Sequence, residues 1–230
     1  MRYHRYYMSK TIVITGGSDG LGKAIAARLA PNNKVVILSP SEEKLKAVAE
    51  EIGCDYKVCD VRDYAQCEQV LQEIGQVDCL VNNAGLWIQG ELDQDDPARI
   101  HQVLEVNLLG VINMTKAVIP AMKQQKSGLI ININSQAGLY AKAERAVYNA
   151  SKWGVTGFTK SMQPELAKYG IGVTGLYPGM MQTDMFSKMG IEKDMSKGLD
   201  TEDVAKTIEF ILSFDKLTLF PEIGIKHLEN

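Results

Sequence analysis

The sequence predicts an α/β protein, a doubly wound Rossmann sandwich of three layers around a seven-stranded parallel sheet. One observation lies near the start of the chain: an uncharged, β-branched run at residues 11–15 precedes a glycine-rich turn at residues 16–22 and a helix-forming segment that stops at Pro31. A second is the strict alternation of strand and helix patterns, with short connections, along the rest of the chain. Such alternation implies parallel strands, right-handed crossovers and helices on both faces of the sheet.

The elements are expected in the following order. Strands are predicted at residues 10–15, 34–39, 55–59, 77–81, 128–134, 171–177 and 220–225. Helices are predicted at residues 20–30, 41–52, 63–74, 97–123, 146–168 and 201–214. The fourth helix opens with Asp96 as N-cap and Pro97 in the first turn. The carboxylates of Asp93, Asp95 and Asp96 are therefore interpreted as capping and solvated groups rather than metal ligands.

Length and composition agree with one folded unit. The 230 residues lie near the upper end for one hydrophobic core, so residues 10–230 are expected to form a single domain. Residues 1–9 are interpreted as an N-terminal extension or an expression remnant, with Met8 a plausible native start. The formal net charge of −3 gives no broad basic surface, and no apolar run approaches the roughly 18 residues that span a bilayer. We expect a cytoplasmic protein that binds neither nucleic acid nor membrane.

The four cysteines, Cys54, Cys59, Cys67 and Cys79, show no Cys-x-x-Cys spacing, and the chain has three histidines. Zinc ligation is therefore disfavoured and no metal site is predicted. Reduced thiols in a cytosolic protein are the preferred interpretation.

Two patterns carry chemistry. A glycine turn between a buried strand and a helix points backbone N–H groups and the positive end of the helix dipole at a phosphate. Tyr148 and Lys152 are four residues apart in a predicted helix, so both side chains lie on one face. A neighbouring cation favours a phenolate, which predicts a tyrosine that exchanges protons nearer to neutral pH than its ordinary value of about 10. Alone, such a pair is more often a solvated helix surface.

Five segments in order resemble the short-chain dehydrogenase/reductase family. They are Thr15-Gly16-x-x-x-Gly20-x-Gly22, Asn82-Asn83-Ala84-Gly85, Asn107 in Val106–Gly110, Ser135 thirteen residues before Tyr148, and Pro178-Gly179-Met180-Met181-Gln182-Thr183. The match extends from about Lys10 to the C-terminus. In the predicted sheet the chemical segments all lie at the carboxyl ends of strands, where ligands bind in such folds.

The resemblance implies an NAD(P)(H)-dependent oxidoreductase that interconverts a carbonyl and a secondary alcohol. Tyr148 would be the general acid/base, and Lys152 would hold the nicotinamide ribose and lower the pKa of the tyrosine. Ser135 would bind the substrate oxygen. Asn107 would interrupt its helix and hold a water that links Lys152 to solvent.

The same resemblance implies a set of cofactor contacts near the glycine turn and the strand ends. They are Thr15, Gly16, Ser18, Asp19, Gly20, Leu21, Gly22, Ser39, Asp60, Val61, Asn83, Ala84, Gly85, Tyr148, Lys152, Pro178, Gly179 and Thr183. The choice between NAD and NADP stays open. An acid at the end of the second predicted strand would favour NAD and an arginine nearby would favour NADP, but this chain has Ser39 at that strand end and Ser41 just after it.

Substrate identity has weaker support. Met180, Met181, Met185, Phe186 and Met189 crowd the segment after Pro178, which favours a small, apolar substrate under a flap, although plain packing explains them equally well. Trp87 is either a wall of the same cleft or a packed loop residue, and no arginine or lysine is assigned to a substrate carboxylate.

A catalytically idle dinucleotide-sensing regulator and a methyltransferase are the competing classes, and neither needs the Tyr–Lys pair. Relatives also pair the helices at 97–123 and 146–168, which implies a homodimer or homotetramer.

Overall fold

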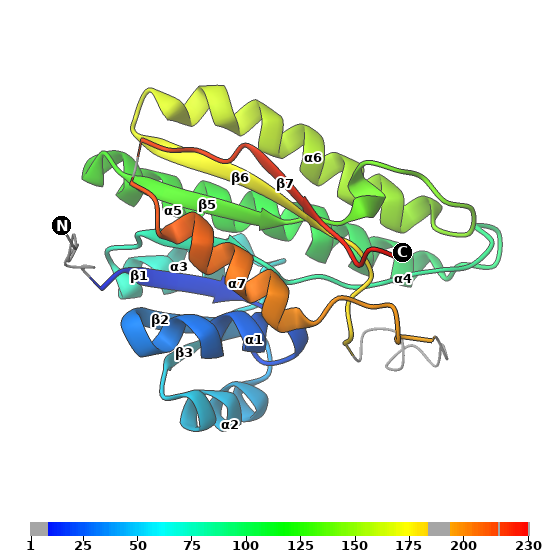
Figure 1. The fold of residues 1–230 in the computed structure, drawn as a ribbon, viewed down its shortest axis with the longest axis horizontal. Helices are drawn as coiled ribbons and strands as arrows, with labels where there is room; N and C mark the ends of the chain where they lie inside the picture. The colour runs from blue at the N-terminus through cyan, green and yellow to red at the C-terminus, as the bar shows by residue number, and fades with distance from the viewer. Residues whose placement is uncertain (1–8, 184–193, 216, 230) are drawn as a thin grey trace.

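A seven-stranded, all-parallel sheet lies at the centre of the computed structural model, with helices on both faces (Figure 1). The structure describes residues 9–183, 194–215 and 217–229. Most of the expected N-terminal extension, and the flap residues Met185, Phe186 and Met189, lie outside the described residues. The predicted doubly wound fold is confirmed.

The strands follow the spatial order β3-β2-β1-β4-β5-β6-β7. Successive crossovers therefore run in one direction from β1 to β3 and in the other from β4 to β7, so the strand order reverses between β1 and β4. Ligands bind beside that reversal, beyond the carboxyl ends of the strands. The strands are β1 (Thr11–Thr15), β2 (Lys34–Ser39), β3 (Asp55–Val58), β4 (Cys79–Asn82), β5 (Gly128–Ile133), β6 (Ile171–Pro178) and β7 (Glu222–Ile225).

The helices form where they were predicted, with shifts of a few residues at their ends. Four of them begin at aspartates whose side chains accept backbone N–H groups of the first turn, namely Asp19, Asp63, Asp96 and Asp200. The helices are α1 (Gly20–Leu29), α2 (Glu42–Ile52), α3 (Tyr64–Ile74), α4 (Pro97–Leu104), α5 (Gly110–Gln125), α6 (Ala146–Ala167) and α7 (Thr201–Leu212), with short 3-10 turns η1 (Ala30–Asn32) and η3 (Gln136–Gly138).

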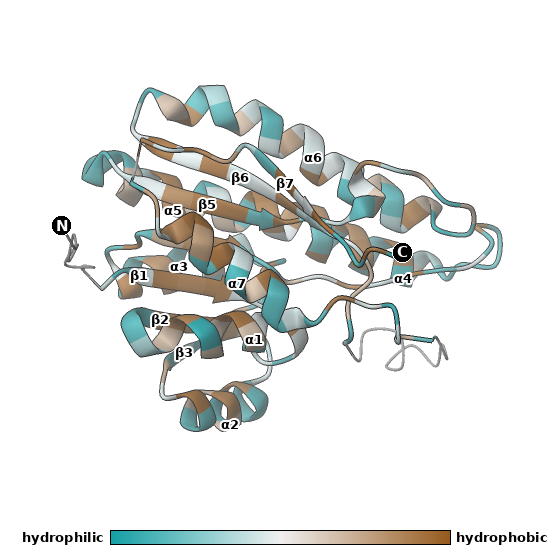
Figure 2. Ribbon diagram, in the orientation of Figure 1, coloured by the Kyte–Doolittle hydropathy of each residue, from teal (hydrophilic) through white to brown (hydrophobic). Residues whose placement is uncertain are grey.

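Alternate strand residues feed two separate hydrophobic layers. In β1, Ile12 and Ile14 pack with α1, α2 and α7, whereas Val13 packs on the opposite face with α3, α5 and α6. All three side chains are fully buried, as expected for a parallel strand covered on both faces. Figure 2 shows apolar residues concentrated along the strands, while the helices carry polar residues as well. These two layers hold the strand ends in fixed positions at the site.

The helix predicted at 97–123 is divided into two helices in the structure. A π-helical turn, η2 (Glu105–Leu109), separates α4 from α5 and contains Asn107. This confirms the expected local interruption at Asn107. Such wide turns insert one extra residue into the helical path and are frequent at functional sites.

The segment Pro97–Gln125 is 29 residues long with a mean hydropathy of 1.3, so length and composition alone would let it cross a membrane. The expectation that no segment is long and apolar enough to span a bilayer is therefore wrong by length and composition. In the fold, however, α5 contacts α3, β4 and β5, and its Met114, Val118 and Met122 side chains are buried against the sheet. The segment serves here as part of a helical layer.

Candidate active site

A cavity of about 1320 Å³ opens at the carboxyl edge of the sheet. Its wall comes from the segments that follow β1, β2, β3, β4, β5 and β6, together with the start of α6. Most residues predicted for the site lie on this wall: Gly16, Ser18, Asp19, Gly20, Leu21, Ser39, Asp60, Val61, Asn83, Ala84, Gly85, Ser135, Tyr148, Lys152, Pro178, Gly179 and Thr183. Segments that are distant in sequence therefore meet at the place that the strand order predicts.

Thr15, Gly22 and Asn107 are not among the described residues that line this cavity, and they support its wall from behind. The Thr15 hydroxyl oxygen accepts the backbone N–H groups of Asn83 at 2.9 Å and Ala84 at 3.0 Å, which ties the end of β1 to the segment after β4. A Cβ at Gly22 would collide with the Gly16 carbonyl and lie 2.6 Å from the Asn83 side-chain nitrogen. Only glycine fits there.

The turn between β1 and α1 has the geometry of a phosphate site. Gly16 and Gly20 have φ angles of +65° and +48°, in the left-handed region that favours glycine. A Cβ at Gly16 would lie 2.9 Å from the Ala84 Cα, so the backbone can make the turn only without a side chain. The start of α1 lies on the cavity wall, where the helix dipole favours an anion. The residues present therefore fit the pyrophosphate of a dinucleotide.

The far end of the cavity, beside β2 and β3, differs from a simple acidic adenosine site. The Ser39 hydroxyl oxygen accepts hydrogen bonds from the Ser18 hydroxyl at 3.1 Å and from the Ser41 backbone N–H at 3.2 Å. Arg62 donates from Nε to Asp60 Oδ1 at 3.0 Å and from Nη2 to Asp60 Oδ2 at 2.5 Å, and this ion pair lowers the pKa of Asp60. The Asp60 charge is thus already balanced within the chain.

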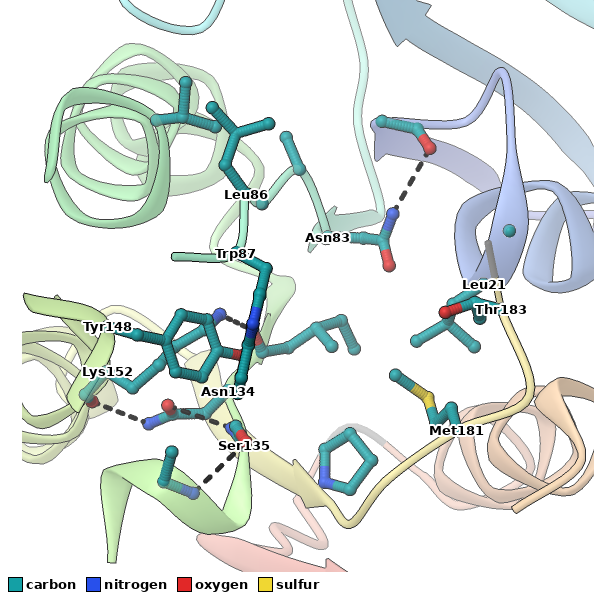
Figure 3. A pocket seen from close by; sticks show the side chains of 18 of the residues that line it. Leu21, Asn83, Leu86, Trp87, Asn134, Ser135, Tyr148, Lys152, Met181 and Thr183 are labelled. Atoms are coloured by element: carbon teal, nitrogen blue, oxygen red, sulfur yellow. Dashed lines mark hydrogen bonds between the residues drawn. The ribbon is translucent and has the colours of Figure 1, made fainter. Parts of the chain in front are cut away.

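Tyr148 stands in the first turn of α6 and is almost fully buried at the cavity wall. Its ring packs against the indole of Trp87, with centroids 4.3 Å apart and an interplanar angle of 54°. In Figure 3 these two rings lie across the pocket from Leu21, Met181 and Thr183. Trp87 is therefore a wall of the cleft, one of the two interpretations left open by the sequence.

Burial raises the pKa of Tyr148 to about 12, although a hydrogen bond with the Ser135 hydroxyl and the positive charge of Arg145 act in the opposite direction. The expectation of a lowered pKa is thus wrong for this structure. The physical reason is desolvation under Trp87, which disfavours the phenolate more than the nearby polar groups stabilise it. The phenol is therefore protonated at neutral pH and can donate its proton.

Lys152 follows Tyr148 by one turn on the same face of α6, as predicted. Its Nζ donates a hydrogen bond of 3.1 Å to the Ile133 carbonyl oxygen and lies 5.9 Å from the Tyr148 ring centroid. Desolvation lowers the pKa of this buried ammonium to about 8. Lys152 is therefore a cation that is held at the end of β5 and faces the cavity.

The amide of Asn107 is fully engaged. Its Oδ1 accepts the Leu86 N–H at 2.7 Å, while its Nδ2 donates to the Leu86 carbonyl at 2.8 Å and to the Ser151 hydroxyl at 3.2 Å. The Ser151 hydroxyl donates in turn to the Tyr148 carbonyl at 2.7 Å. Asn107 therefore joins the segment after β4 to α6, and its side chain positions the loop rather than lining the cavity.

Ser135 follows β5 and faces the cavity beside Tyr148. Its hydroxyl oxygen accepts the Ala137 N–H at 3.1 Å, which starts the short turn η3. The neighbouring Asn134 donates to the Lys152 carbonyl and the Thr156 hydroxyl at 3.2 and 2.8 Å, which fixes the β5 end against α6. The serine, tyrosine and lysine thus converge from two elements that hydrogen bonds hold together.

Sequence reasoning missed several polar residues on the wall. These include Arg62, Arg99, Asn134, Gln136, Lys142, Arg145 and Lys226. The spacing of Arg145 could have identified it, because it precedes Tyr148 by three residues, close to one helical turn, and so lies near the tyrosine. The others depend on how loops fold over the strand ends.

A parallel doubly wound sheet with a glycine cradle, facing a buried Tyr–Lys–Ser group, defines a dinucleotide-dependent oxidoreductase. Residues 10–194 match the short chain dehydrogenase family. The chain belongs to this family of NAD(P)-dependent short-chain dehydrogenases and reductases, as its motifs predicted.

Among similar proteins, carbonyl reductase family member 4 of Xenopus tropicalis is 36% identical over 224 residues, which span 92% of this chain and 94% of that protein. The 3-oxoacyl-acyl-carrier-protein reductase of Escherichia coli is 34% identical over 222 residues, or 90% of this chain and 91% of that one. An archaeal alcohol dehydrogenase from Thermococcus sibiricus, complexed with 5-hydroxy-NADP, has a TM-score of 0.88 at 27% identity and covers 97% and 98% of the two chains. A closed serine dehydrogenase complexed with NADP⁺ has a TM-score of 0.90 at 26% identity, with 96% of each chain covered.

Proposed function

We propose that this protein interconverts a carbonyl and a secondary alcohol with Tyr148 as general acid and base. The observation that carries the proposal is the convergence of Tyr148, Ser135 and Lys152 on one cavity whose opposite wall is the glycine turn. A regulator that only sensed a dinucleotide would have no use for a buried phenol at that place.

The proposed roles follow from position and charge. A bound nicotinamide dinucleotide supplies or accepts the hydride. During reduction Tyr148 donates its phenolic proton to the carbonyl oxygen, and the Ser135 hydroxyl stabilises the charge that develops on that oxygen. The Lys152 ammonium orients the ribose and offsets part of the phenolate charge once the proton has left. Trp87 and the surrounding apolar side chains exclude water from the reacting atoms.

NADP(H) is the cofactor we propose. Ser39 ends β2 where an acidic side chain would grip a ribose 2′-hydroxyl and repel a 2′-phosphate. The solved relatives complexed with NADP⁺ or 5-hydroxy-NADP support the same choice.

Replacement of Tyr148 by phenylalanine tests the proposal. The variant should still shift NADPH fluorescence on titration but lose at least about 1000-fold in kcat/KM for every carbonyl that the wild-type protein reduces. Tyr64→Phe is the matched control, because Tyr64 lies outside the cavity on α3 and its phenol bonds only Glu68 among the described residues. Retained turnover by the Tyr148 variant would exclude the proposed acid. Cofactor binding by the wild type without turnover of any carbonyl would instead favour the sensing regulator.

We also infer a homo-oligomer that pairs the helices η2–α5 and α6. Leu109 and Trp153 are 49% and 51% exposed on elements that contact each other, so they offer apolar surface that a second copy can bury. Light scattering at micromolar concentration tests this, and Trp153→Glu should shift the mass to a smaller species. A wild-type monomer would refute the inference. The cytoplasmic location stays a prediction.

A further inference from the structure

The cavity wall is divided by charge. Its described acidic residues, Asp19 and Asp60, both lie at the end that holds the glycine turn and β3, and Asp60 is paired with Arg62. The end beside Trp87 and Tyr148 is lined by basic residues: Arg99, Lys142, Arg145 and Lys152. Among the residues that the structure describes, no carboxylate bonds the Arg145 guanidinium. The methionine-rich segment after Pro178 favoured an apolar substrate, but such a substrate would not interact with these positive charges.

The backbone holds Arg145 in place at the start of α6. Glu144 has a φ angle of +61°, a conformation that non-glycine residues rarely adopt. Its carbonyl oxygen accepts the Gly90 N–H at 2.9 Å, while the Arg145 carbonyl accepts the Asn149 N–H at 2.8 Å as the helix begins. A local conformation of this cost persists only where surrounding contacts fix it. The backbone at Arg145 is therefore held by the loop that contains Gly90 and by the first turn of α6.

The Arg145 guanidinium lies over the Trp87 indole, with Cζ 5.1 Å from the ring centroid. Its Nε is buried and has no hydrogen-bond partner, and no hydrogen bond or ion pair joins the guanidinium to any described residue. A partly buried cation without an acceptor is unfavourable unless a ligand supplies one. A planar fork of N–H donors matches a carboxylate better than it matches a single carbonyl oxygen.

Trp87 connects this cation to the proposed proton donor. The indole contacts both the Tyr148 ring, with centroids 4.3 Å apart, and the Arg145 guanidinium, so the phenol and the positive charge share one aromatic neighbour. Arg99 donates to the Trp87 carbonyl at 3.0 Å and to Gln102 at 2.7 Å, which anchors the segment that carries the indole. A substrate oxygen bound at Tyr148 would thus place its other substituents near Arg145.

We propose that Arg145 is a specificity-determining residue that binds the carboxylate of a short-chain oxo acid, or of the corresponding hydroxy acid. The inference rests on the proposed function, because it names the substrate class of that same site. In reduction, hydride adds to the carbonyl carbon as the C=O π bond breaks, and the Tyr148 proton moves to the oxygen. The carboxylate keeps its charge and takes no part in the bond changes. Arg145 contributes binding energy for the oxo acid but not for a neutral ketone, which has no carboxylate.

The test compares 2-, 3- and 4-oxo acids with their methyl esters as substrates, with NADPH, in the full-length protein. Each pair shares one reacting carbonyl and differs in charge. The wild type should show kcat/KM at least about tenfold higher for one acid than for its ester, and Arg145→Gln should lower that ratio to about one. Arg145→Lys should restore part of the ratio, since it keeps the charge but not the fork. An unchanged NADPH affinity confirms that each variant is folded.

Lys142→Gln is the matched control, because it removes one positive charge from the same loop without changing the cation that contacts Trp87. It should alter the acid-to-ester ratio less than about threefold. A ratio that falls for Lys142→Gln but not for Arg145→Gln overturns the assignment. An active enzyme that prefers the esters, or reduces neutral carbonyls and no oxo acid, overturns the inference while leaving the proposed function intact. A protein that turns over no carbonyl refutes the proposed function itself.

Discussion

The Lys152 ammonium donates a hydrogen bond of 3.1 Å to the carbonyl oxygen of Ile133, the last residue of β5. One contact thereby fastens α6 to the sheet edge and keeps a cation out of water, since Lys152 is only 5% exposed. Desolvation lowers the pKa of this ammonium to about 8, so the site carries a charge that the fold itself disfavours. Such an arrangement is unfavourable for stability and useful for holding an electronegative ligand.

Removal of that charge should therefore stabilise the folded chain. Lys152→Met keeps the side-chain length, and we expect the free energy of unfolding in urea at pH 7 to rise by about 1–3 kcal/mol while turnover is lost. The expected gain in stability depends on pH. The folded pKa near 8 lies below the unfolded value of 10.5, so the unfolded state binds more protons between these two pH values, and Lys152 makes stability rise with pH there. The stability difference between wild type and Lys152→Met should shrink across that window, and a difference independent of pH would contradict the argument.

The same titration should appear in cofactor binding. As pH rises through about 8 the Lys152 ammonium loses its proton, so NADPH affinity should fall across that range, as measured by fluorescence titration. A mixed-buffer series at constant ionic strength separates this from screening. Lys152→Met should bind more weakly at pH 7 and show a flat profile. If the wild-type profile is also flat to pH 9, the ammonium does not contact the cofactor.

The amide of Asn107 should tolerate no change of charge. Asn107→Asp keeps the shape but removes the Nδ2–H donors to Leu86 and Ser151, and it buries a carboxylate at a position with no exposed surface. We expect a loss of about 2–4 kcal/mol in urea unfolding at pH 7, and a smaller loss at pH 5 because burial raises the pKa of the new carboxyl.

Asn113→Asp is a matched control for that change, since Asn113 also donates from Nδ2 to a backbone carbonyl, that of Val61 at 2.9 Å, but is only partly buried. The loss in free energy of unfolding for Asn113→Asp should be about 1 kcal/mol. Equal losses for the two variants would show that burial at Asn107 is not what makes its amide essential.

The architecture was predictable from sequence because its signals are local. The run Thr11–Thr15 and the glycines after it specify a strand, a turn and a helix within a few residues, and the alternation that follows fixes the parallel order. The interruption at Asn107 was also expected, through the family resemblance, although its π-helical form was not.

The properties that depend on distant contacts were not predictable. The pKa of Tyr148 rises because Trp87, from another loop, covers the phenol, and helical spacing to Lys152 says nothing about that burial. The place of Arg145 on the cavity wall likewise follows from loop contacts such as the backbone bond between Gly90 and Glu144, which joins two loops. Both loops lack the periodic patterns from which elements are inferred.

A side chain at Gly22 should distort the phosphate turn. Gly22→Ala places a Cβ against the Gly16 carbonyl and the Asn83 amide, neither of which can move without breaking the contacts of β1 and β4. We expect a loss of about 1–3 kcal/mol in stability and at least tenfold in NADPH affinity. Ala27→Gly, at an exposed position of the same helix, should cost about 1 kcal/mol without changing NADPH affinity. Unaltered NADPH binding by Gly22→Ala would remove this turn from the cofactor site.

Cofactor choice can be tested at Ser39, whose hydroxyl accepts hydrogen bonds from Ser18 and Ser41 at the cavity wall. Ser39→Asp places a carboxylate at the end of β2, where it attracts a ribose 2′-hydroxyl and repels a 2′-phosphate. The ratio of kcat/KM for NADPH to that for NADH should fall at least about tenfold, which corresponds to about 1.4 kcal/mol of discrimination. Ser41→Asp is the control, because Ser41 precedes α2 and is not among the described lining residues, and an aspartate suits a helix start. If the wild type already prefers NADH, or if both variants change the ratio alike, Ser39 is not the residue that discriminates, and the proposal of NADP(H) loses its structural support.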